Sequence, residues 1–481
     1  MQARSASTDH DQALDGRDGA FFQQSSSVKH WFADGVFRAV LRNAGYLGSG
    51  KLAGALLGLI ALACAGRGLS PAMFGVLMIV HIYASGAGAL VKFQTWQFIV
   101  RYGAPALLRG DKAYARDSIR LAFGLDIASG LIGMVLAMAA LPLLASRLDL
   151  TGDTLPLAFV YCTLVPTMSA ATAVGVLRLL DRFDLIGAQQ IVTPILRAIG
   201  ASIAYFGHFG FVGFVATWYI ADLGGDLVLW AMAARELKRH DMLDAFRPGL
   251  FGTARRLPKA WSFVWTTNIA HSISAAWGPL SNLIVAGTLG PVAAGLYKIA
   301  STLMDSTSKP ADLLSRGFYP EIMRLDPTSK QPWKLGLRVG ALSACIGIAV
   351  ILLVMIGGKP VIGLIFGRKY LEAFDLLRLM TWSLVVSTAA FPLESLLYMV
   401  DRQKTALAMQ TLSAVLYLGL LYLLTNSLGL NGAGIAYLAG TVLTGLLMLA
   451  PTLSSYRDRA RYRPHPHPAP PDADPALEPA T

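Results

Sequence analysis

Residues 69–75 read LSPAMFG, and residues 289–295 read LGPVAAG, which places the second stretch 220 positions (289 minus 69) after the first. The same offset pairs other residues along the chain: Phe98 with Phe318, Leu177 with Leu397, Asp181-Arg182 with Asp401-Arg402, and Gln190 with Gln410. Such a duplication indicates two related halves. In a membrane protein, two copies of one helical bundle usually place the working site between them, which favours a transporter.

The composition shows that lipid is the natural solvent of this chain. Its 481 residues are 54% hydrophobic and 15% charged, whereas a soluble domain has about 25% charged residues. Apolar runs of about 20 residues recur, the length that a helix needs to cross a ~30 Å hydrocarbon core. These runs lack the alternation of barrel strands. We therefore predict an all-α polytopic membrane protein.

The hydropathy pattern predicts about twelve transmembrane helices in two six-helix lobes. The spans run approximately over residues 43–65, 72–100, 118–145, 155–177, 185–207, 211–234, 260–286, 291–316, 335–357, 375–400, 404–425 and 430–452. The predicted organisation is a disordered tail with an interfacial amphipathic helix (1–42), an N-terminal lobe (43–234), a basic cytoplasmic linker (235–259), a C-terminal lobe (260–452) and a disordered cytoplasmic tail (453–481). Alternatively, residues 28–42 simply begin the first span.

The distribution of basic residues predicts the orientation. With the N-terminus inside, the inner segments carry 25 basic residues and the outer loops carry five, as the positive-inside rule requires. Both termini are therefore expected in the cytoplasm. Because this sidedness accounts for the net charge of +12, nucleic acid is not an expected partner. Six spans per lobe bring both copies into the membrane the same way round, so their pseudo-twofold axis should follow the membrane normal.

The sequence lacks enzymatic and metal-binding motifs. It has no phosphate-binding glycine loop with Lys-Ser/Thr, no H-E-x-x-H and no nucleophile elbow, and its three cysteines form no C-x-x-C pair. The predicted outer loops are only a few residues long, except for residues 358–374. We therefore expect a protein that is not an enzyme, with no cofactor, no metal and no catalytic residue.

Ionisable side chains inside the predicted spans point to a wetted interior, because each costs about 2.5–3.5 kcal/mol at bilayer depth. In span 2, His81, Ser85, Gly88, Lys92 and Trp96 share one helical face, and in span 8 the same is true of Lys298, Thr302, Asp305, Lys309, Asp312 and Arg316. Both faces should line a shared central cavity. The candidate substrate-binding residues are Lys51, Lys92, Arg197, His271, Lys298 and Asp305.

Each of these candidates has a structural alternative. Lys51 and Lys92 could extend along the helix to the inner interface. His271, which the repeat pairs with Lys51, could be an ordinary interhelical histidine. Lys298 and Asp305 lie two turns apart and could form an internal salt bridge.

Spans 5, 6 and 11 carry further polar groups. Asp222 and Asp226 lie one turn apart in span 6, where such a pair could hold a proton, so they are candidates for ion coupling. Alternatively, Arg197 or Lys298 neutralises them. Span 5 shows a polar stripe that includes Arg197, and span 11 repeats the stripe without charge, as Gln410, Ser413 and Tyr417.

Three short motifs carry a resemblance to a known family: GLSPxxxG at residues 68–75, LGPxxxGLY at 289–297 and FGxxYxxA at 366–373. Through them the chain resembles the bacterial oligosaccharide and lipopolysaccharide flippases, within the superfamily that also holds multidrug/toxin extruders and peptidoglycan-precursor flippases. The resemblance covers residues 43–452, and its motifs identify the fold better than the cargo.

The resemblance implies two six-helix lobes in a V around a cavity. It also implies flipping of undecaprenyl-diphosphate-linked glycan units across the bacterial inner membrane for surface polysaccharide or lipopolysaccharide assembly. Lys51, Lys92, Arg197 and Lys298 would neutralise the diphosphate. Membrane lipids and assembly proteins such as a polymerase and a chain-length regulator are the expected partners. The alternative is a cation-coupled multidrug or toxin antiporter of the same superfamily, which Asp222 and Asp226 would serve.

Overall fold

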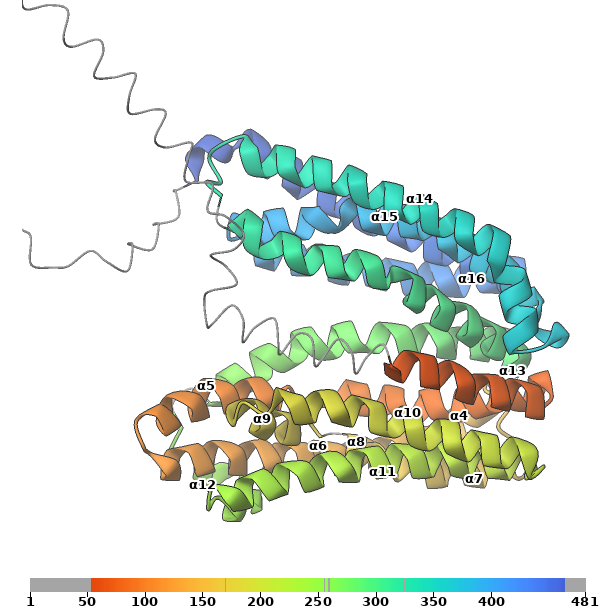
Figure 1. Cartoon of the computed structure of the whole chain (residues 1–481), viewed down its shortest axis with the longest axis horizontal. Helices are drawn as coiled ribbons and strands as arrows, with labels where there is room; N and C mark the ends of the chain where they lie inside the picture. The colour runs from red at the N-terminus through yellow and green to blue at the C-terminus, as the bar shows by residue number, and fades with distance from the viewer. Residues whose placement is uncertain (1–52, 169, 255, 258–259, 324, 463–481) are drawn as a thin grey trace, which may run out of the picture.

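The computed structural model describes residues 53–168, 170–254, 256–257, 260–323 and 325–462, and over these residues the protein is helical, without a strand (Figure 1). Lys51 and the predicted amphipathic helix of residues 28–42 lie outside the described residues. The first described helix, Ala53–Gly68, precedes α4.

The N-terminal part contains α4 Pro71–Val91, α5 Thr95–Leu108, α6 Lys112–Ala145, α7 Thr154–Cys162, α8 Val165–Met168, α9 Ala171–Leu179, α10 Phe183–Phe206, α11 Gly210–Arg239, η1 Leu243–Phe246 and α12 Phe251–Ala254. The C-terminal part contains α13 Ala260–Met323, α14 Gln331–Ile365, η2 Arg368–Tyr370, α15 Glu372–Met399, α16 Gln403–Arg457 and η3 Arg459–Arg461.

Two glycines divide the longest helices. Gly290 has φ 80° inside α13 and Gly429 has φ 62° inside α16, both in the left-handed region that glycine tolerates best. Pro291 follows the first glycine and has no N–H to continue the hydrogen-bond ladder. Each helix therefore contains two of the predicted spans, and the described helices occupy the positions of all twelve.

The helices are those of an all-α polytopic membrane protein. Seven of the described helices are long and apolar enough to cross a membrane by length and composition, and the bent pair Thr154–Cys162 with Val165–Leu179 would make eight. The other predicted spans fall on the shorter described helix 53–68, on α10 with its charged Asp184 and Arg197, and on the second parts of the divided helices.

The duplication is visible in the backbone. Asp181 and Asp401 both have positive φ, 55° and 59°, although neither is glycine. After them, the N–H of Arg182 donates to the carbonyl of Leu177 at 2.8 Å, and the N–H of Arg402 donates to that of Leu397 at 2.9 Å. This is the hydrogen bond of a helix C-terminal turn in the left-handed conformation. The repeated sequence thus forms the same turn twice.

In Figure 1, α4 to α11 form one group of helices, and α14, α15, α16 and residues 291–323 form the other. The two groups meet at the end where α13 is labelled, and their ribbons diverge toward the other end. Residues 260–289 run along the first group, where the ring of Trp265 lies 5.4 Å from that of Phe93. Against Gly86 they pack so closely that a Cβ there would lie 2.8 Å from Pro279.

Two predicted spans are broken. Span 72–100 divides into α4 and α5 at residues 92–94, and span 155–177 divides into α7, α8 and α9. The buried carboxylate of Asp126 joins both breaks, because it accepts from the hydroxyl of Thr95 at 2.9 Å and from the backbone N–H of Thr172 at 2.7 Å. At the second break, Asp126 thereby satisfies a backbone N–H, that of Thr172, which a continuous helix would have satisfied itself.

Candidate functional site

The two groups of helices are joined where the GLSPxxxG and LGPxxxGLY motifs cross. A Cβ built on Gly75 of α4 would lie 1.8 Å from the carbonyl oxygen of Pro291, and one on Gly295 would lie 3.3 Å from the Cα of Gly75. A side chain at position 75 would push the helices apart. The glycines therefore allow α4 and α13 to touch backbone to backbone.

The FGxxYxxA motif completes the same junction. The ring of Tyr370 packs edge-on against Phe74 with centroids 5.4 Å apart. Nearby, the guanidinium Nε of Arg67 donates to the carbonyl of Ile365 at 3.0 Å, and Lys369 donates to the carbonyl of Leu69. The three motifs, far apart in sequence, thus form one contact between the two groups.

A cavity of about 300 Å³ lies within the first group. It is lined by His81, Ser85, Gly88, Ala89, Lys92, Met168, Thr193, Asp222 and Asp226. Four of these belong to the predicted polar face of span 2. Trp96, the fifth member, leaves that face because α4 ends at Val91, and its ring lies 3.8 Å from the guanidinium of Arg178 instead.

A buried charge network forms one wall of this cavity. Arg197 of α10 forms an ion pair with Asp222 of α11. The hydroxyl of Tyr161 donates to Asp222 at 2.6 Å, and the Nδ1 of His81 lies 3.3 Å from the same carboxylate oxygen. The guanidinium of Arg197 also lies 5.4 Å from the ring centroid of Trp218. Arg197 therefore neutralises Asp222, which is the alternative that the sequence left open for this pair of residues.

Asp226 and Lys92 stand apart from this network. Asp226 accepts a hydrogen bond from the hydroxyl of Thr167 at 3.0 Å, and its charge interacts electrostatically with Asp222 and Lys92. In the described part of the chain, Lys92 makes no hydrogen bond or ion pair through its ammonium. Its charge is thus available to a ligand in the cavity.

Lys298 reaches this region from the other side of the junction. Its charge interacts electrostatically with Arg197 and with Asp305 on its own helix, and it also acts on His81. The structure therefore places Lys92, Asp222 and Asp226 on the lining of one cavity and pairs Arg197 with Asp222, whereas Lys298 acts on this region electrostatically without lining the cavity. The backbone of His271 belongs to α13, but its side chain is outside the described part, as is the whole of Lys51.

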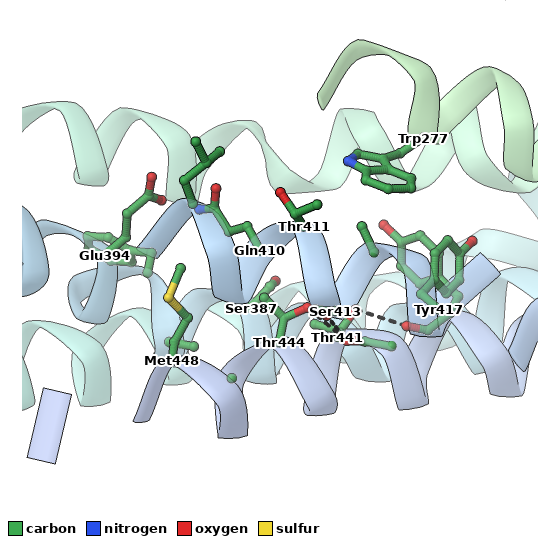
Figure 2. Close-up of a pocket in the computed structure, with 17 residues that line it drawn as sticks. Trp277, Ser387, Glu394, Gln410, Thr411, Ser413, Tyr417, Thr441, Thr444 and Met448 are labelled. Atoms are coloured by element: carbon green, nitrogen blue, oxygen red, sulfur yellow. Dashed lines mark hydrogen bonds between the residues drawn. The ribbon is translucent and has the colours of Figure 1, made fainter. Parts of the chain in front are cut away.

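A second cavity of about 520 Å³ lies between residues 260–289, α15 and α16. It is lined by Trp277, Ser387, Ala390, Phe391, Glu394, Leu407, Gln410, Thr411, Ser413, Ala414, Tyr417, Tyr437, Gly440, Thr441, Thr444, Gly445 and Met448. Figure 2 shows Trp277 on the helix that faces Tyr417 and Thr411. The uncharged stripe of span 11, Gln410, Ser413 and Tyr417, lies here.

The sequence did not single out Tyr161, which donates a hydrogen bond to Asp222 of the first cavity, or Trp277, which lines the second. Each lies in an apolar run where an aromatic residue is usually packing material, so its role depends on neighbours from distant helices. Asp126 is buried, and its carboxylate accepts hydrogen bonds from residues at both helix breaks. Among the described residues, no group of three or more His, Cys, Asp or Glu could hold a metal ion.

Comparison with known proteins identifies related sequences. Residues 66–375 match the family model described as polysaccharide biosynthesis protein. The chain is also 51% identical over 351 residues to the inner membrane protein YghQ of Escherichia coli (strain K12), which covers 73% of this chain and 99% of that protein.

Solved structures share the fold at low identity. The inward-facing conformation of a multidrug resistance MATE family transporter of the MOP superfamily has a TM-score of 0.66 and 16% identity, over 85% of this chain and 95% of that one. The outward-facing conformation of a transporter described in the same words has a TM-score of 0.57 and 15% identity, over 87% and 96%. At these identities, the likeness establishes the helical architecture alone.

Proposed function

The chain belongs to the polysaccharide biosynthesis protein family, and from that membership we propose that it flips undecaprenyl-diphosphate-linked oligosaccharide units from the cytoplasmic to the outer leaflet of the bacterial inner membrane. It would do so by alternating access, for surface polysaccharide or lipopolysaccharide assembly. The polar head group must cross while its polyprenyl tail stays in lipid. Two helix groups that separate sideways would allow this.

The observation that carries the proposal is a pair of cations, Lys92 in the cavity of the first group and Lys298 on the other group. Lys92 lines the cavity, and among the described residues its ammonium makes no hydrogen bond or ion pair, although its charge interacts with that of Asp226. Lys298, from the other group, interacts electrostatically with Arg197 and His81 at the wall of the cavity. An ammonium is a compact charge that suits a phosphate. Arg197, paired with Asp222, would instead hold the cavity wall.

The test replaces both lysines in a strain that depends on this chain. Lys92→Ala with Lys298→Ala should abolish surface polysaccharide and cause lipid-linked intermediates to accumulate, because the diphosphate then lacks its counter-charges. The readouts are polysaccharide staining, extraction of lipid-linked glycans and an immunoblot of the membrane fraction.

The matched control is the double variant Lys238→Ala and Lys359→Ala, which removes two exposed lysines distant from the cavity. It should leave polysaccharide at the level of the unaltered protein. Normal polysaccharide in the cavity variant, with the protein present in the membrane, would refute the role of these cations.

A cation-coupled multidrug or toxin antiporter is the second candidate, and the buried Asp222, with the half-buried Asp226 and His81 in the same cavity, favours it. Carboxylates inside a helical bundle often mark ion pathways. In a deletion strain the two functions differ: a flippase defect changes surface glycan, whereas an antiporter defect lowers tolerance to cationic toxins.

The orientation with both termini in the cytoplasm is part of the proposal. It places the basic inter-lobe segment inside and the joined end of the helix groups outside. A polymerase and a chain-length regulator would then receive the flipped unit at the outer leaflet, while membrane lipids surround the polyprenyl tail.

A further inference from the structure

The cavity of Figure 2 differs chemically from the cavity that contains Lys92. None of its lining residues is Lys, Arg or His, and its one carboxylate, Glu394, accepts a hydrogen bond from the hydroxyl of Tyr398 at 2.7 Å. The remaining polar lining consists of hydroxyl and amide groups. A diphosphate would find no counter-charge here.

Some of these polar groups are already paired and others are not. Ser413 bonds Thr444, and the hydroxyl of Tyr417 lies 3.2 Å from that of Tyr297. Within the described chain, the amide of Gln410 and the hydroxyl of Thr411 have no hydrogen-bond partner. Together these two side chains can donate and accept, as a ligand rich in hydroxyl groups requires.

Aromatic side chains line the same cavity as these hydroxyl and amide groups, a combination that suits a sugar. Trp277 comes from the helix packed on the first group, whereas Tyr417 and Tyr437 come from α16, so the ligand would contact both. A sugar ring offers C–H bonds on its faces and hydroxyls at its edge. Indole and phenol rings suit the faces, and amide and hydroxyl groups suit the edge. The volume of about 520 Å³ lies within the usual range for ligand pockets, about 300–1,000 Å³.

We propose that this second cavity binds uncharged sugar residues of the cargo, with Trp277 against a ring face and Gln410 and Thr411 at the hydroxyls. The inference rests on the proposed function and assigns the two parts of the cargo to different cavities. The diphosphate lies at Lys92 and Lys298, and the glycan extends toward α16. Glu394 disfavours an acidic sugar at its end of the cavity.

Photocrosslinking in cells tests this with the cell's own lipid-linked glycan. A benzophenone amino acid replaces Thr411 in one variant, Ser85 of the first cavity in a second and the lipid-exposed Leu352 of α14 in a third. After irradiation, the purified protein is digested and its adducts are identified by mass spectrometry. We expect hexose or hexosamine adducts at position 411, adducts of the lipid-linked glycan at position 85 and phospholipid adducts at position 352.

The two proposals fail differently in this experiment. Lipid-linked glycan captured at position 85, with phospholipid alone or no adduct at position 411, would overturn the sugar site and leave the flippase proposal standing. Absence of glycan at both positions, with phospholipid captured at position 352, would overturn both.

Substitution of the tryptophan gives an independent readout. Trp277→Ala should slow export of the lipid-linked glycan about fivefold, whereas Trp277→Phe should stay within about twofold because it keeps an aromatic face. Trp382→Ala removes an indole that is 53% exposed on α15, and it controls for loss of a membrane tryptophan. Equal export by the Trp277→Ala and Trp382→Ala variants would contradict the stacking role.

Discussion

At Asp222, one carboxylate has three neighbours from three other helices: Arg197, Tyr161 and His81. Spacing within a single helix predicted that Asp222 and Asp226 share a face, but not which of them has a cation. The structure pairs Asp222 with Arg197 and leaves Asp226 with Thr167. The two aspartates are therefore not equivalent.

Removing one partner of the Arg197–Asp222 pair should destabilise the protein more than removing both. Arg197→Met should lower the free energy of unfolding by about 3–5 kcal/mol, because it leaves a buried carboxylate without its cation. Arg197→Met combined with Asp222→Asn should recover part of that loss. Denaturant titration in detergent measures both variants.

Arg338→Met, at an exposed position of α14, is the control and should change the free energy of unfolding by less than about 0.5 kcal/mol. If the double variant proves no more stable than Arg197→Met alone, the ion pair is not what makes Arg197 necessary.

At the scale of elements, the crossing of α4 and α13 depends on the absence of a side chain at Gly75. Gly75→Ala should open the junction, because the new Cβ would meet the carbonyl of Pro291. Helix propensity alone predicts the opposite, a gain of about 0.5–1 kcal/mol from alanine in a helix. Faster maleimide labelling of Leu69→Cys, in a background free of other cysteines, would report the opening in purified protein.

Gly58→Ala is the matched control, since its Cβ would meet nothing within 4 Å in helix 53–68. That variant should keep the slow labelling of the unaltered protein. Slow labelling in Gly75→Ala as well would mean that the helices accommodate a methyl group at the crossing.

The broken helices show where hydropathy misleads. An apolar run predicts that a segment lies in the membrane, but it does not show where the hydrogen-bond ladder stops. Asp126 of a third helix accepts a hydrogen bond at each break, from the hydroxyl of Thr95 after α4 and from the backbone N–H of Thr172 at the start of α9. The sequence shows Asp126 in span 3, and only the packing shows what it bonds.

For the molecule as a whole, the membrane potential should assist the proposed transport. Outward movement of each uncompensated negative charge gains about 2.3 kcal/mol per 100 mV with the interior negative, which is about a 50-fold shift in distribution. A synthetic prenyl-diphosphate disaccharide in proteoliposomes, with a potassium potential set by valinomycin, measures this. Reversing the sign of the potential is the control. If the distribution of the disaccharide lipid between the leaflets is the same under both signs, a cation that moves with the diphosphate compensates its charge.

The sequence by itself determined the all-helical membrane fold, the approximate positions of its long helices, the duplication and the family. Hydropathy, helical period and a fixed offset are all read along the chain and need no knowledge of which helices touch. The polar face from His81 to Lys92 was predicted for the same reason. It lines a cavity formed by helices of the first group, whereas the sequence predicted a cavity shared with the polar face of span 8. Gly290 likewise marked the boundary between two spans, because glycine followed by proline ends a helix locally.

Only the tertiary structure decided which charges are paired and which cavities exist. Lys92 and Arg197 were equal candidates in the sequence, and they differ because α11 brings Asp222 to Arg197. Trp277 joins Gln410 and Thr411 across more than 130 residues because helix 260–289 faces α16. Ion pairing and cavity shape depend on distances between helices, and those distances arise from packing that no local pattern records.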